Sequence, residues 1–137
     1  MIMIVCVDDN FGMMFNQRRQ SRDKIVCENI LKLTQNGNLL MNAYSAKLFS
    51  EQQKDNIVVR EDFLEVAQAQ DYCFVENVEW SKYQEKITKI ILYRWNREYP
   101  ADTYFTFPIE KEQWKLQETS EIEGNSHSIT KEVYIHA

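Results

Sequence analysis

The chain has 137 residues, of which 44% are hydrophobic and 27% are charged, and its formal net charge is −5. This length and composition predict one soluble globular domain spanning residues 1–137. The acidic net charge makes a nucleic-acid-binding surface an unfavourable interpretation. No stretch approaches the ~20 apolar residues of a membrane span, and the apolar run 1–7 is too short for a signal peptide. We therefore expect no membrane partner.

Cysteines and histidines give no sign of a metal centre. Cys6, Cys27 and Cys73 are scattered and lack CxxC spacing, which predicts reduced, buried thiols and a cytoplasmic location. His127 and His136 are the only histidines, and neither belongs to a set with zinc-ligand spacing. The sequence therefore predicts no metal site, and it offers no catalytic residue.

The first apolar run predicts the centre of the fold. Met1–Val7 is continuously apolar and contains β-branched residues, which is typical of a strand buried on both faces of a sheet. Tyr72–Val75 and Ile87–Trp95 have the same character. We expect these two segments to flank the first strand.

Residues 8–20 are polar and predict an irregular loop before the first helix. Ser21 is expected to cap that helix, with Asp23 in its first turn and Asn36-Gly37 at its end. The apolar face of the helix is predicted from Val26, Ile30 and Leu33.

The remaining elements follow from similar patterns. Short strands are expected at 38–41 and 57–59, and helices at 44–49 and 61–69, the second with Phe63, Leu64 and Ala67 inward. Late strands are expected at 104–107, 114–119 and 128–135, with a turn at 123–125. Together they predict an α/β domain with a mixed, mostly parallel central sheet, flanking helices and antiparallel C-terminal strands.

The order of these elements and several local strings resemble dihydrofolate reductase over nearly the whole chain. The resemblance implies that family's fold, with a flexible loop after the first strand. The matching strings are Val7-Asp8 followed by Gly12 and Asn16, Leu39–Met41, Asn56–Val59, Leu92–Arg94, Ala101–Phe105 with Trp114, and Ser126–Ser128.

The resemblance fails where the family holds its nicotinamide cofactor. Asn42–Lys47 replaces the family's glycine-containing phosphate turn at a helix start. Val59 passes directly to Arg60, so a strand and a loop are missing. Phe74–Asn77 replaces a Gly-Gly pair, and Glu76 within it would repel a pyrophosphate. We therefore expect no cofactor, and no stabilisation by NADPH.

The substrate side departs from the family as well. Asp23 lies near the carboxylate with which the family orients its pterin, although a first-turn aspartate also stabilises a helix. Arg18–Ser21 replaces the family's tryptophan and proline, and Gln53-Lys54 stands where an arginine should pair with the folate tail. Because the bidentate clamp is lost, the resemblance does not extend to folate reduction.

One cluster remains as a candidate ligand site. Asp23, Arg19 and Arg22 are predicted to supply polar contacts to a cleft, and Phe11 and Phe15 to form its apolar walls. The competing interpretation is a solvated loop whose arginines pair loosely with acidic neighbours.

Three hypotheses of function follow, and the first two differ in whether any chemistry remains. The first is a non-reductase binding domain that recognises a small anionic or heteroaromatic ligand or a partner protein. The second is a divergent reductase with altered cofactor use. The third is an acidic interaction protein, such as an inhibitor carried by a mobile element. A homodimer is compatible with all three.

Overall fold

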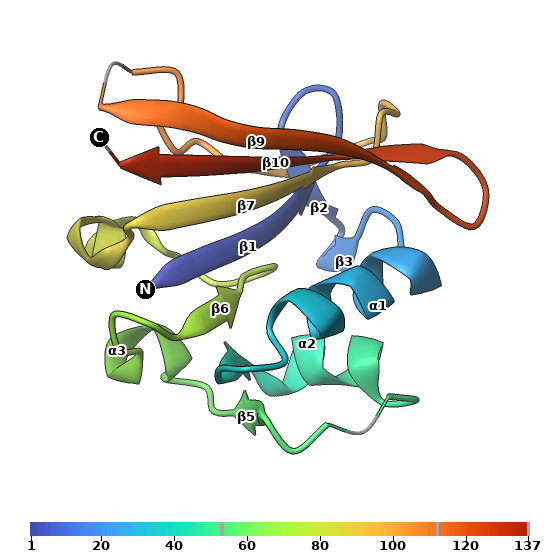
Figure 1. Cartoon of the computed structure of the whole chain (residues 1–137). Helices are drawn as coiled ribbons and strands as arrows, with labels where there is room; N and C mark the ends of the chain where they lie inside the picture. The colour runs from blue at the N-terminus through green and yellow to red at the C-terminus, as the bar shows by residue number, and fades with distance from the viewer. Residues whose placement is uncertain (53, 112, 137) are drawn as a thin grey trace.

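The first strand lies inside the main sheet, as the sequence predicts. In the computed structural model, which describes residues 1–52, 54–111 and 113–136, β1 (Ile2–Val7) pairs in parallel with β6 (Tyr72–Phe74) on one side and β7 (Lys89–Arg94) on the other. Figure 1 shows β1 between them, with the N-terminus at its start. The prediction for Met1–Val7 is confirmed.

Seven strands form this mixed sheet, in the order β5-β4-β6-β1-β7-β10-β9. Four neighbouring pairs, from β5 to β7, are parallel, and the two pairs that involve β10 are antiparallel. The chain is thus a mixed α/β domain with few helices. The other strands are β4 (Leu39–Met41), β5 (Ile57–Val59), β9 (Trp114–Glu123) and β10 (Ser128–His136).

The two faces of the sheet are covered differently. The helix α1 (Lys24–Leu33) packs Val26 and Ile30 on one face, together with α2 (Ala43–Ala46) and the 3-10 turn η1 (Lys47–Phe49). The opposite face is covered by α3 (Phe63–Val66) and by aromatic residues from loops. The rings of Trp80, Phe105, Phe107 and Trp114 contact one another there, with centroids 5.1–5.9 Å apart. A second 3-10 segment, η2 (Ser81–Lys86), precedes β7.

The predicted irregular loop at residues 8–20 is wrong in part. This segment contains β2 (Gly12–Phe15) and β3 (Arg18–Arg19), which form a three-stranded sheet with β8 (Thr103–Tyr104). Asn16 and Gln17 connect β2 to β3, and both have positive φ, as a two-residue hairpin turn requires. The sequence lacks the Asn-Gly signal for such a turn.

Three other expectations need correction. The cap of α1 is Asp23 rather than Ser21, because the Asp23 carboxylate accepts hydrogen bonds from the N–H groups of Ile25 and Val26. The helix expected at 61–69 is only one turn. The strand expected at 104–107 ends at Tyr104, since Phe107 enters the aromatic cluster instead. None of the described helices is both long and apolar enough to cross a membrane.

Candidate functional site

The edge of the sheet where the parallel strands end is the expected place for a ligand. After β1 the chain moves to β4 and β5 on one side, returns to β6, and then crosses to β7 on the other side of β1. In open α/β sheets, ligands bind outside the carboxyl ends of the strands where the connections change direction. Here that point is the crevice beyond β1 and β6. A carboxylate follows each strand closely, Asp8 after β1 and Glu76 after β6.

Asp8 is fully buried and satisfied mainly by backbone. Its Oδ1 accepts hydrogen bonds from the N–H groups of Asn10 and Gly12, at 2.9 and 2.7 Å, and its Oδ2 accepts from the Tyr99 N–H and from Gln20 Nε2. Burial raises the pKa of Asp8, but these hydrogen bonds outweigh it and hold the pKa below its ordinary value of 3.8. A Cβ on Gly12 would lie 3.0 Å from Oδ1 and 2.5 Å from Gln20 Nε2, so the turn needs glycine here.

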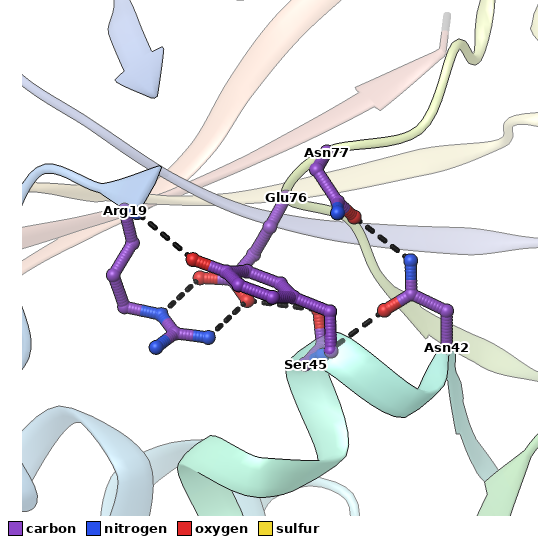
Figure 2. Close-up of polar contacts among 6 residues, drawn as sticks. Arg19, Asn42, Ser45, Glu76 and Asn77 are labelled. Carbon is purple, nitrogen blue, oxygen red and sulfur yellow. Dashed lines mark hydrogen bonds and ion pairs between the residues drawn. The ribbon is translucent and has the colours of Figure 1, made fainter. Parts of the chain in front are cut away.

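The hydrogen bonds that the Glu76 carboxylate accepts come from side chains. Its two carboxylate oxygens accept hydrogen bonds from Arg19 Nε at 2.8 Å and Arg19 Nη2 at 2.9 Å, and Ser45 Oγ donates to Oε1 at 2.8 Å. The Arg19 and Glu76 side chains are 18% and 10% exposed. Figure 2 shows Arg19 extending from β3 to Glu76, with Ser45 of α2 beside the pair. The hydrogen bonds to Glu76 raise the pKa of Arg19 further, so its guanidinium stays charged.

Further contacts hold Arg19 and Ser45, the two partners of Glu76, in place. The Tyr44 hydroxyl accepts a hydrogen bond from the Arg19 N–H, and the Tyr44 ring lies 4.5 Å from the Arg19 guanidinium carbon. Asn42 caps α2 by accepting from the Ser45 N–H, and its Nδ2 donates to Asn77 Oδ1 (Figure 2). An external anion would therefore have to displace Glu76 from Arg19, and an external cation would have to displace Arg19 from Glu76.

The space left in the crevice is small. The cavity between α1 and the sheet has a volume of about 20 Å³, which is room for about one water molecule. A drug-sized ligand needs a pocket of ~300–1,000 Å³, so the cavity admits no such ligand in this conformation. Its lining includes Cys6, Arg19, Gln20, Arg22, Asp23, Val26, Cys27, Phe74, Glu76 and Trp95.

The structure brings together three of the five predicted site residues. Arg19, Arg22 and Asp23 line the same cavity, whereas Phe11 and Phe15 do not belong to its lining. The two predicted aromatic walls thus lie outside this cavity, whose apolar lining includes residues of α1 and β6. Phe11 lies at φ 61° with its ring 4.8 Å from the Arg94 guanidinium carbon, and Phe15 is 41% exposed beside another groove.

Asp23 has a structural use that the sequence did not indicate. Besides capping α1 through Oδ1, it accepts a hydrogen bond from the Asn125 N–H at 2.8 Å on Oδ2, which joins the helix to the β9–β10 turn. A Cβ on Gly124 would lie 2.5 Å from that oxygen. Both carboxylate oxygens are therefore engaged within the protein.

The cysteines that line the cavity are poor nucleophiles. Burial raises the pKa of Cys27 to about 11, and burial with the nearby Glu76 charge raises that of Cys6 well above its ordinary value. Both remain thiols at neutral pH. Cys27 and Cys73 are buried as predicted, while Cys6 is only partly buried. Within the described ranges, no three His, Cys, Asp or Glu residues are grouped to hold a metal ion.

Sequence reasoning considered Ser45 only as a contact for an external anion, and it assigned Glu76 only a repulsive role. The signal for the ion pair was weak because Arg19 and Glu76 are 57 residues apart. Gln53, expected to lie near the folate-tail position, falls outside the described residues. Comparison with models of protein families finds no match for the chain, and comparison with curated proteins finds none either.

Proposed function

We propose that the chain is a non-reductase binding domain built on a scaffold like that of dihydrofolate reductase. The internal position of β1 and the antiparallel β9–β10 hairpin after a parallel series support the likeness of fold. The edge position of β5, followed at once by α3, fits the interpretation that a strand and a loop of that family are missing.

One observation carries the proposal. The crevice beyond β1 and β6, where such a scaffold would place its pyrophosphate, holds the ion pair of Arg19 and Glu76 instead. A dinucleotide would have to break two charge-assisted hydrogen bonds and meet the Glu76 carboxylate. Each such bond contributes roughly 1.5–3 kcal/mol, so the loss of both weakens binding by more than a hundredfold.

The test is NADPH binding and oxidation. We expect ~1 mM NADPH to leave the melting temperature unchanged, since a ligand stabilises only what it binds. We also expect no loss of NADPH absorbance with dihydrofolate. The variant Glu76→Ser removes the opposing charge, and the matched control Glu79→Ser changes an exposed glutamate three residues away. Stabilisation of the unaltered protein by NADPH, with backbone amides of Ser45 and Glu76 shifting in NMR spectra, would restore the divergent reductase.

A protein partner is the second candidate, and one feature favours it. β9 is a ten-residue edge strand with mostly exposed side chains, and among the described residues it pairs with β10 alone. Long open edges can accept another strand. Strand addition would slow amide exchange along residues 114–123 and would appear as a larger species in sedimentation velocity. Fast exchange at every protein concentration would exclude self-association through this edge.

A further inference from the structure

The outer face of the β2–β3 hairpin forms an open groove separate from the closed crevice. The groove has a volume of about 570 Å³, within the range of small-molecule sites. Arg19 and Gln20 line both this groove and the closed cavity. The other residues that line the groove are Phe15, Asn16, Arg18, Tyr99 and Pro100.

The hairpin places an aromatic ring beside a cation on this face. Phe15 and Arg18 are direct partners across the two strands, and directly opposed residues project to the same face about 5 Å apart at Cβ. The neighbouring pair, Met14 and Arg19, projects to the opposite face, where Met14 is buried and Arg19 meets Glu76. The guanidinium of Arg19 is therefore engaged by Glu76, whereas Arg18 projects to the face of the groove.

Arg18 is available to a ligand. It is exposed, and none of the ion pairs among the described residues involves it. Its position beside the exposed Phe15 ring suits a planar anion, because the ring can stack on the ligand while the guanidinium pairs with its charge.

The far wall of the groove is fixed by the rest of the fold. Tyr99 packs partly against the core cluster under α1, and its N–H donates to Asp8. Gln20 Nε2 donates to Asp8 and to the Pro100 carbonyl, whereas Gln20 Oε1 is buried without a hydrogen-bond donor from any described residue. An unpaired buried acceptor is unfavourable, and Gln20 lies between this groove and the closed cavity.

The turn that positions the groove is strained. Gln17 has φ 62°, a conformation that non-glycine residues adopt at a cost in free energy. The Asn16 N–H donates to Asp102 Oδ2, which ties the turn to the segment before β8. Such strain is retained where the surrounding structure requires one backbone geometry.

From these observations we infer that the groove between Phe15, Arg18 and Tyr99 binds an aromatic anion. This inference rests on the proposed binding function and names its ligand class and site. The anionic group is a carboxylate or a phosphate paired with Arg18. The ring lies against Phe15 and Tyr99.

The experiment uses the whole chain labelled with ¹⁵N and four kinds of probe. Indole-3-carboxylate represents aromatic carboxylates and adenosine monophosphate represents nucleotides. Indole supplies a ring without charge, while acetate and inorganic phosphate supply charge without a ring. We expect at least one of the two aromatic anions to shift the amides of Phe15, Arg18 and Gln20, and the other probes to bind at least ~tenfold more weakly. Which of the two binds identifies the anionic group.

Variants then test the assigned contacts. Arg18→Gln and Phe15→Ser should each weaken binding by about tenfold or more. Arg97→Gln is the matched control, since Arg97 is also exposed but does not line the groove, and it should bind as the unaltered protein does. The inference is overturned if neither aromatic anion shifts these amides at ~10 mM, or if Arg18→Gln binds equally well. Those outcomes leave the NADPH result untouched, so the two proposals fail separately.

Discussion

Two carboxylates stand at the ends of neighbouring strands, and their partners differ in kind. Asp8, after β1, receives three of its four hydrogen bonds from backbone N–H groups. Glu76, after β6, is held by the side chains of Arg19 and Ser45. Backbone partners hold the turn itself, whereas side-chain partners can be lost or exchanged without a change of chain path. We therefore assign Asp8 to the architecture of the strand end, and Glu76 to the closure of the crevice.

The largest expected effect is the removal of the Asp8 carboxylate. Asp8→Ala leaves three backbone donors and Gln20 Nε2 without their acceptor in a fully buried place. We expect the free energy of unfolding to fall by about 3–4 kcal/mol, measured by urea denaturation. Asp9→Ala, at an exposed neighbour, should change it by no more than about 0.5 kcal/mol. Equal effects of the two substitutions would remove the architectural role of Asp8.

A smaller effect is expected for the pair of Arg19 and Glu76. Each of Arg19→Gln and Glu76→Gln leaves a mostly buried charge without its partner, at a cost of about 1–3 kcal/mol. The double variant should cost less than the sum of the two, because each single change already breaks the same contact. A double-mutant cycle by urea denaturation measures this coupling. If the losses of unfolding free energy in the two single variants simply add up in the double variant, the two side chains are not coupled and the ion pair does not stabilise the fold.

The comparison also predicts a pH dependence. Because the pKa of Asp8 is lower in the folded protein than its ordinary value of 3.8, its ionisation stabilises the fold above that value, and this contribution is lost as the pH falls through the lowered pKa. The difference in unfolding free energy between the unaltered protein and Asp8→Ala should therefore shrink as the pH is lowered from about 5 to about 3. A difference that stays constant or grows over this range would contradict the sign of the shift.

The parallel core could be predicted from the sequence because its signal is local. Continuous apolar runs such as Met1–Val7 reveal a strand buried on both faces. The hairpin of β2 and β3 could not, since its turn uses Asn16 and Gln17 at positive φ where glycine is usual. Arg19 is placed beside Glu76 by that hairpin, so the ion pair could not be predicted once the hairpin was not. The ligand site was predicted from residues close in sequence, but the hairpin places Arg19 at the closed cavity and the Phe15 side chain on its opposite, outer face.

The smallest expected effect concerns Asp23, a third carboxylate that combines both kinds of use. Asp23→Ser keeps a hydroxyl that can cap α1 but removes Oδ2, the acceptor of the Asn125 N–H. We expect a loss of about 0.5–1.5 kcal/mol, and about 1–2 kcal/mol for Asp23→Ala, which also loses the cap. Urea denaturation of both variants measures the difference, and Lys24→Ala, at the exposed next position, is the control. If Asp23 is held by the protein on both oxygens, its removal lowers stability in the absence of any ligand. Unchanged stability in Asp23→Ala would instead show that this carboxylate is available to bind a ligand.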